Sequence, residues 1–372
     1  MKITDVSAQL LKPTEFEFQW KDQLPPRRVG MILLRIRDDE GHEGQCITWL
    51  AGPGQFEDML PRVRDTLVGQ DPHDIERFSY QLTDNLTAPN AVSSGVDIAL
   101  WDLVGKIHEQ PVYKLLGAAR DRVRAYASTV RYDTVPEYVD LALQCRDEGF
   151  TAYKLHAFGV PDKDIEVCRA VREAVGDTMD LMLDPVNAYD RQGAFKVGKV
   201  LEELDFYWYE APIEDADIQG LTDLTRYFSI PITAVESVGG GLKFVPPYLV
   251  NHAVDSVRSV GDWTGGITAM RKTAALCEAF GVKFEPHSYG STLIQAAHFH
   301  VMLAIHNCDL VELPVPTGVL DQGMKDTLRV TADGYVDAPT KPGLGYEIDE
   351  DEIDNLTVRR LTVGDASSVV GH

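Results

Sequence analysis

Acidic residues recur at the ends of short apolar runs in this chain. The runs LMLD, YWYE and TAVE end in Asp184, Glu210 and Glu236, and each acid lies 26 residues after the previous one. That spacing fits one strand, one helix and their loops, so the acids are expected on neighbouring parallel strands. A single such acid is often a helix cap, but three buried carboxylates in register are costly unless they share a cation. Their oxygens predict a site for one Mg²⁺ ion per subunit, because Mg²⁺ prefers oxygen ligands.

Three basic residues and one further acid also lie at the ends of apolar runs. Lys154 and His156 end the run AYKLH, and residues two apart on a strand point to the same face. His287 ends VKFEPH, and Glu312 ends CDLVE. A lysine beside a divalent ion can have a lowered pKa and act as a base, whereas histidine titrates near neutrality unaided. Two such groups on opposite faces of a substrate suit racemisation, or proton removal and donation in an elimination.

The elements that must position these residues alternate along the chain after Arg124. Apolar strand-like runs are VRAYAS, AYKLH, DLMLD, FYWYE, ITAVE, VDSVRS, VKFEPH and CDLVE. Amphipathic stretches between them are EYVDLALQCRDEG, DIEVCRAVREAVG, AFKVGKVLEEL, IQGLTDLTRYF, FVPPYLVNHA, ITAMRKTAALCEAFG and TLIQAAHFHVMLAI. Eight strands with seven helices predict an α/β barrel, with an open doubly wound sheet as the alternative. In a barrel, the carboxyl ends of the strands share one mouth, which would bring the polar residues together.

The first part of the chain has a different pattern. Strand-like segments come first, ending with QCITWL, and helical periodicity follows from Phe56 to Leu116. We therefore predict an α+β capping domain at residues 1–122, a barrel at 123–315, and a tail at 316–372 that returns to the capping domain.

Charge, cysteine spacing and hydropathy argue against several classes of protein. The formal net charge of −23 disfavours nucleic acid and anionic membranes as partners, because a polyanion would be repelled. The five cysteines lie far apart without a CxxC pair, so neither a disulfide framework nor a thiolate zinc site is expected. We find no secretory signal pattern and no apolar run long enough to span a membrane, which predicts a cytoplasmic protein.

The sequence resembles the enolase superfamily over nearly its full length, and its mandelate racemase-like branch in particular. The segments that carry the resemblance are VDIALWDLVGK, YKLH, LDPVN, YEAPIED, VES, GGIT, EPHSYGS and VELP. The resemblance implies a modified TIM barrel with a capping domain and a homo-oligomer. It also implies that Asp184, Glu210 and Glu236 bind Mg²⁺ and that Lys154 and His156 occupy the Lys-x-Lys position. His287 matches the base on the opposite face, and Glu312 the carboxyl that polarises the substrate.

Departures from the family pattern concern the partners of these residues. The aspartate that usually orients the histidine base is replaced by Val260, and Asp262 could substitute if the loop shifts. His156 replaces the more common lysine, and Asn187 lies one position later than the usual polar partner of the metal aspartate. By the same resemblance, loops near residues 15–28 and 48–56 would close the site and select the substrate.

These expectations define one reaction class. Abstraction of the proton next to a carboxylate produces an enediolate, which Mg²⁺, Lys154 and a hydrogen bond from Glu312 would stabilise. Loss of a neighbouring hydroxyl would then convert a sugar acid, a small anionic substrate, into a 2-keto-3-deoxy acid. The alternatives are a racemase or epimerase, a lactone cycloisomerase, and a noncatalytic barrel that binds acids.

Overall fold

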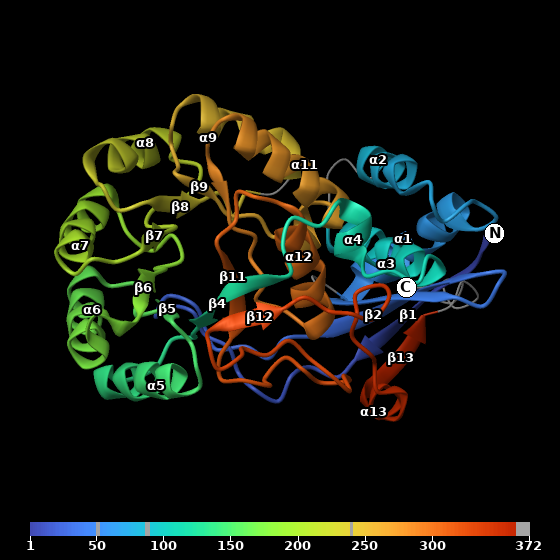
Figure 1. Cartoon of the computed structure of the whole chain (residues 1–372), viewed down its shortest axis with the longest axis horizontal. Helices are drawn as coiled ribbons and strands as arrows, with labels where there is room; N and C mark the ends of the chain where they lie inside the picture. The colour runs from blue at the N-terminus through green and yellow to red at the C-terminus, as the bar shows by residue number, and fades with distance from the viewer. Residues whose placement is uncertain (50–52, 86–89, 239–240, 362–372) are drawn as a thin grey trace, which may run out of the picture.

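Two sheets organise this chain. The computed structural model describes residues 1–49, 53–85, 90–238 and 241–361. Figure 1 shows a curled parallel sheet surrounded by helices, with an antiparallel sheet and its helices to one side. This architecture is a modified TIM barrel with a capping domain, so the predicted fold class is confirmed.

The curled sheet contains the eight strands that were predicted. They pair in parallel in the order β10-β9-β8-β7-β6-β5-β4-β11. The backbone N–H of Phe284 donates to the carbonyl of Asn307 at 2.7 Å, which links the two ends of this order. The strands are β4 (Arg122–Ser128), β5 (Ala152–Leu155), β6 (Asp180–Leu183), β7 (Trp208–Glu210), β8 (Ile232–Ala234), β9 (Ser256–Val257), β10 (Lys283–Phe284) and β11 (Leu310–Pro314). A further strand, β12 (Tyr335–Asp337), pairs antiparallel with β4.

Helices cover the outside of this sheet, as Figure 1 shows for α5 to α8. Several begin at residues that cap a helix: Thr134 forms a capping box with Glu137, and Asp190 accepts a hydrogen bond from the backbone of Gly193. The predicted helices are α5 (Val135–Asp147), α6 (Pro161–Val175), α7 (Arg191–Glu203), α8 (Ile218–Tyr227), α9 (Pro246–Val250), α11 (Gly266–Ala279) and α12 (Thr292–Ala304). Short elements that were not predicted are α10 (Gly261–Thr264), η1 (Gly176–Thr178) and η2 (Gly241–Phe244).

The capping domain combines both ends of the described chain. Its antiparallel sheet has the order β13-β1-β2-β3, and Ala8 pairs with both Leu34 and Leu361, so the tail returns as predicted. A Cβ on Gly44 would lie 2.0 Å from the carbonyl oxygen of Ala99, so only glycine allows this close approach of a helix to the sheet. The elements are β1 (Ile3–Leu11), β2 (Met31–Asp38), β3 (Glu43–Trp49), α1 (Pro53–Leu67), α2 (Ile75–Asn85), α3 (Ala91–Ile107), α4 (Val112–Leu116), α13 (Glu350–Leu356) and β13 (Thr357–Leu361).

The interior of the described chain includes the cysteines and helix α12. All five cysteines are buried and free. Helix α12 is buried almost throughout and contacts α4 and β3 of the capping domain as well as β11 of the barrel. Among the described residues, no helix has both the length and the apolar character needed to cross a bilayer. The domain boundaries after residues 122 and 315 remain our proposal.

Candidate active site and metal centre

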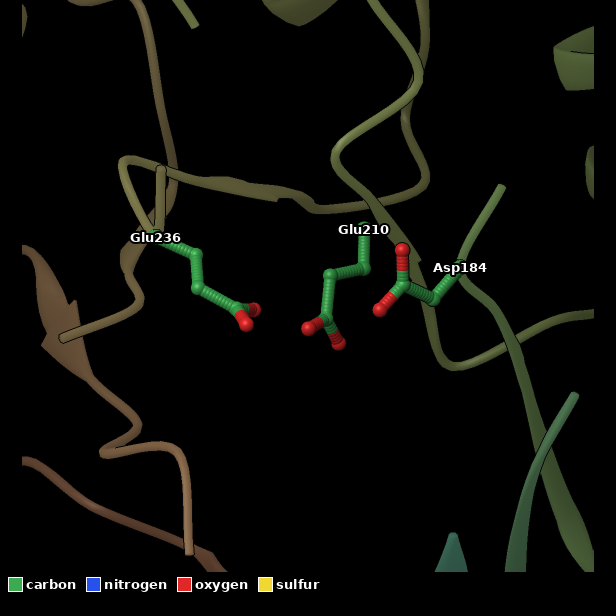
Figure 2. Close-up of side chains that lie close together, drawn as sticks. All are labelled: Asp184, Glu210 and Glu236. Carbon is green, nitrogen blue, oxygen red and sulfur yellow. The ribbon is translucent and has the colours of Figure 1, made fainter. Parts of the chain in front are cut away.

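Three carboxylates converge at the carboxyl ends of neighbouring strands. Asp184 directly follows β6, Glu210 ends β7, and Glu236 lies two residues beyond β8. Each offers an oxygen within 4.8 Å of the others, and Figure 2 shows Glu210 between the other two side chains. The structure therefore brings together the three acids that the spacing selected, in an all-oxygen arrangement that suits Mg²⁺.

The backbone beside each acid has an uncommon conformation. Val235, Ala211 and Val186 have φ values of 83°, 37° and 55°, and none of them is glycine. Such conformations are costly, particularly for a β-branched residue, and they concentrate at functional sites. Asp215 supports one of them, since its carboxylate accepts hydrogen bonds from the backbone N–H groups of Val235 and Ser237 at 2.9 and 2.7 Å. Each of the three acids therefore lies within two residues of a backbone position with an uncommon conformation.

The three acids carry negative charge that is only partly balanced. Burial raises the pKa of Glu210, and nearby Asp184 adds to the rise against the effects of Arg258 and Lys154. Burial also raises the pKa of Glu236 well above its usual range, with further contributions from Glu210 and Asp184. The Glu236 side chain is still 27% exposed, so a dissolved ion can reach it. A divalent cation would relieve this repulsion, so the residues present fit Mg²⁺.

Lys154 lies beneath the acids and is almost completely buried. Its Nζ atom is 3.0 Å from Glu210 Oε1, 3.1 Å from Glu312 Oε1 and 3.4 Å from Asp184 Oδ2. Burial and Arg258 lower its pKa, but these three carboxylates raise it by more, and the net change is a rise. In the absence of a cation, the acids therefore outweigh burial and favour the ammonium form of Lys154. The expected lowering of the pKa concerned a lysine beside a bound divalent ion, and it stays a prediction.

His156 contacts oxygen atoms with both ring nitrogens. Nε2 lies 2.9 Å from Asp184 Oδ2, and Nδ1 lies 2.7 Å from the carbonyl oxygen of Thr129. A protonated ring would donate a hydrogen bond to each of them. Lys154 and His156 therefore both reach Asp184, as their spacing predicted.

Glu312 is held by cations. It forms an ion pair with Lys154, and its Oε2 atom accepts hydrogen bonds from Arg258 Nη2 at 2.6 Å and from the backbone N–H of Ser288 at 2.9 Å. Burial raises the pKa of Glu312, but Arg258 and Lys154 lower it by more, and the net result is a pKa well below the usual range. An ionised carboxylate accepts hydrogen bonds and cannot donate one, so these contacts disagree with the predicted hydrogen bond from Glu312 to the substrate.

His287 lies at the other end of the row of acids. Its Nε2 is 3.7 Å from Glu236 Oε1, beyond hydrogen-bond distance, and Nδ1 has no hydrogen-bond partner among the described residues. Burial lowers its pKa to about 3, an effect that Glu312 opposes and Arg258 reinforces. An anionic substrate beside the ring would raise that pKa again.

The expected replacement of the missing partner of His287 by Asp262 is not seen in this structure. Val260 occupies the usual position and is buried, and neither carboxylate oxygen of Asp262 has a hydrogen-bond partner among the described residues. Asp262 lies in α10, a short turn of helix, and its side chain is fully buried without a hydrogen bond to His287. The hypothesis that Asp262 replaces the missing partner is therefore not supported by the geometry.

The buried Asp262 predicts a dependence of stability on pH. Burial raises its pKa from 3.8 to about 7. The unfolded chain loses this proton near pH 4 and the folded chain only near pH 7, so the folded state loses stability as pH rises between those values, on the order of 4 kcal/mol in total. We expect D262N to remove this loss, so that its Tm relative to the unsubstituted protein increases between pH 4.5 and 7.5. The exposed Asp177 gives the control variant D177N, and a D262N curve parallel to that of the unsubstituted protein would contradict the prediction.

Arg258 is a residue of this site that the sequence reasoning missed. It follows β9 directly and is only 1% exposed, and Nε lies 2.8 Å from Glu210 Oε1 and 3.6 Å from Glu236 Oε2. The sequence did contain a signal for Arg258, because it is a single basic residue near the end of the apolar run VDSVRS. Glu210 and Glu312 were selected by their positions at the ends of such runs.

A cavity of about 210 Å³ opens above these groups. The predicted loop at residues 15–28 supplies Trp20, Leu24 and Arg27 to its wall, and Trp49 comes from the predicted segment 48–56, of which residues 50–52 lie outside the described chain. Other lining residues are His156, Asp184, Val186, Asn187, Ala211, Glu236, Ser237, Val260, Trp263, His287 and Tyr289. Trp263 and Tyr289 were not anticipated. Asn187 donates a hydrogen bond to Ser237 Oγ at 2.8 Å.

Comparisons with known proteins agree with this architecture. Residues 27–117 match the family model of the mandelate racemase/muconate lactonizing enzyme N-terminal domain, and residues 137–352 match that of the enolase C-terminal domain-like family. The chain is 31% identical over 264 residues to arabinonate dehydratase of Saccharolobus solfataricus, covering 68% of this chain and 69% of the relative. It is 30% identical over 384 residues to D-galactarolactone cycloisomerase of Agrobacterium fabrum, covering 95% and 98%.

A solved structure gives the same result in three dimensions. D-glucarate dehydratase from Agrobacterium tumefaciens, complexed with magnesium, superimposes with a TM-score of 0.85 at 31% identity, over 96% of this chain and 100% of that chain.

Proposed function

This chain belongs to the mandelate racemase/muconate lactonizing enzyme family of the enolase superfamily, and on that premise we propose that it is a lyase that dehydrates a sugar acid. The observation that carries the proposal is the convergence of Asp184, Glu210 and Glu236 below a cavity that is lined by two histidines. Relatives of this chain include dehydratases of arabinonate and glucarate, which supports the choice of substrate class.

The metal assignment follows from the donor set. Asp184, Glu210 and Glu236 would hold one Mg²⁺ per subunit, which when bound supplies positive charge to the substrate carboxylate. Below them, the ammonium of Lys154 adds a second fixed cation where negative charge develops in the enediolate. Glu312, held by Lys154 and Arg258, orients both cations and takes no proton itself.

Two histidines can move the protons. His287 and His156 both line the cavity, one near Glu236 and the other near Asp184, so a substrate bound over the acids lies between them. His287 has no hydrogen bond on either ring nitrogen among the described residues, so it can accept the proton from the α carbon. The ring of His156, placed between two oxygens, donates a proton to the hydroxyl on the neighbouring carbon. The C–O bond breaks, water leaves, and the enol product becomes a 2-keto-3-deoxy acid.

A second candidate reaction has specific support. The similarity to a D-galactarolactone cycloisomerase extends over 95% of this chain, so a lactone is an alternative substrate with the same first proton transfer. Racemisation or epimerisation needs only that both histidines exchange protons with one carbon. The predicted cytoplasmic location and homo-oligomeric state also remain proposals.

The experiment that tests the function is a screen of sugar acids and their lactones in D₂O with Mg²⁺, followed by NMR. We expect one or more acids to give a 2-keto-3-deoxy acid with solvent deuterium at C3. Deuterated substrate of both configurations would instead indicate an epimerase, and conversion of a lactone without keto acid a cycloisomerase. Acid binding without exchange of the α proton would indicate a noncatalytic barrel and contradict the proposal.

A further inference from the structure

Arg258 cross-links carboxylates from three different strands. Besides its contacts with Glu210 and Glu236, its Nη2 atom donates to Glu312 Oε2 at 2.6 Å, and Nη1 donates to the backbone carbonyl of Glu285 at 3.3 Å. The guanidinium is planar and its donors are fixed relative to one another, so it can set the separation between the acids that it contacts.

The charges around Arg258 are unbalanced. Four acids gather here, Asp184, Glu210, Glu236 and Glu312, and among the described residues the lysine and arginine side chains that contact them are Lys154 and Arg258. His156 also contacts Asp184 and is counted here as a neutral ring. A bound divalent ion would bring the formal sum of these groups to zero. Without Arg258, the four acids would retain only one fixed cation, and their attraction for a divalent ion would increase.

We propose that Arg258 is a positioning residue that holds Glu210 and Glu312 in place before the metal binds and that limits the affinity of the site for divalent ions. This inference rests on the proposed function, because it takes the three acids as the metal ligands. Arg258 is buried below the cavity and does not line it, so it acts through these carboxylates rather than on the substrate. Arg258 thus lowers the affinity of the site for the metal ion, and it fixes the positions of Glu210 and Glu312.

The test is Mg²⁺ binding by R258Q, measured by calorimetry and by the Mg²⁺-induced change in Tm. We expect the Kd for Mg²⁺ to fall about tenfold, because one positive charge close to the ion is removed. We also expect a lower Tm without Mg²⁺ and a larger gain in Tm on adding it, since the ion replaces the lost charge. A residue with only a packing role would lower Tm equally with and without Mg²⁺.

Arg35 provides a matched control. It is also buried and contacts two acids, Glu43 and Glu350, but it lies on β2 in the capping domain. We expect R35Q to lower Tm by the same amount at every Mg²⁺ concentration and to leave the Kd unchanged.

R258K separates charge from geometry and serves if R258Q fails to fold. It keeps the positive charge but lacks the fork, so we expect a Kd for Mg²⁺ within about twofold of the unsubstituted protein and a kcat about tenfold lower at unchanged KM. An unchanged kcat in R258K, or a Kd in R258Q equal to that of the unsubstituted protein, would overturn the role of Arg258. Failure of the unsubstituted protein to bind Mg²⁺ would contradict the metal site itself and this inference with it.

Discussion

E236Q is expected to lose Mg²⁺-dependent turnover by a factor of at least about 10³, since the electrostatic stabilisation of a developing anion is among the largest contributions to catalysis. Its affinity for Mg²⁺ should fall by about a hundredfold or more, because even the loss of a group that only supports a metal ligand costs 10- to 100-fold. Steady-state kinetics and calorimetry with Mg²⁺ measure the two effects separately.

Glu236 is the best of the three acids for this test. Its side chain is 27% exposed, and its charged contacts are only Arg258 at 3.6 Å and His287 at 3.7 Å among the described residues. Asp184 and Glu210 both pair with the buried Lys154, so removing either one would weaken a buried ion-pair network and mix loss of stability with loss of function.

The control for E236Q is E214Q. Glu214 lies in the YEAPIED segment close to Glu210 but is exposed, and we expect its variant to keep both activity and metal affinity. If E236Q keeps more than about a tenth of the activity with an unchanged Kd for Mg²⁺, the three acids do not form the metal site.

The sequence was sufficient to predict the positions of the site's acids. The alternation of apolar runs and amphipathic helices fixes the order of parallel strands, and a polar residue at the end of such a run has to face the mouth of the barrel. Asp184, Glu210 and Glu236 were found in this way, and their equal spacing placed them on adjacent strands.

The states of the basic residues could not be predicted in this way. Whether the pKa of Lys154 rises or falls depends on how many carboxylates lie within a few ångströms of Nζ, and two of them come from β7 and β11. Arg258 follows the short strand β9 and was missed although it lies near the end of an apolar run, because no regular spacing relates it to the three acids. Its contact with Glu312 lowers the pKa of that carboxyl.

The partner of His287 shows the limit of reasoning from short segments. Asp262 is two residues from the expected position, but the turn α10 buries its side chain without any hydrogen-bond partner among the described residues. A difference of two residues along a turn changes the direction of a side chain by a large angle, and only the three-dimensional structure shows that direction.

H287N is expected to lower kcat by a factor of about 10² to 10⁴, the usual contribution of a positioned acid or base. Of the two histidines that line the cavity, His287 is the one whose ring nitrogens have no hydrogen bond among the described residues, so its loss should remove the proton transfer from the α carbon. Both formation of keto acid and exchange of the α proton with D₂O should therefore fall together in H287N, whereas Mg²⁺ affinity should remain.

The matched variant is H156N, which separates the two roles. Because His156 is assigned to the departing hydroxyl, H156N should stop the formation of keto acid while exchange of the α proton continues through His287. The opposite result, with exchange retained in H287N and lost in H156N, would interchange the base and the acid. Exchange retained in both variants would show that neither histidine removes the α proton, and the base would have to be sought among the other residues that line the cavity.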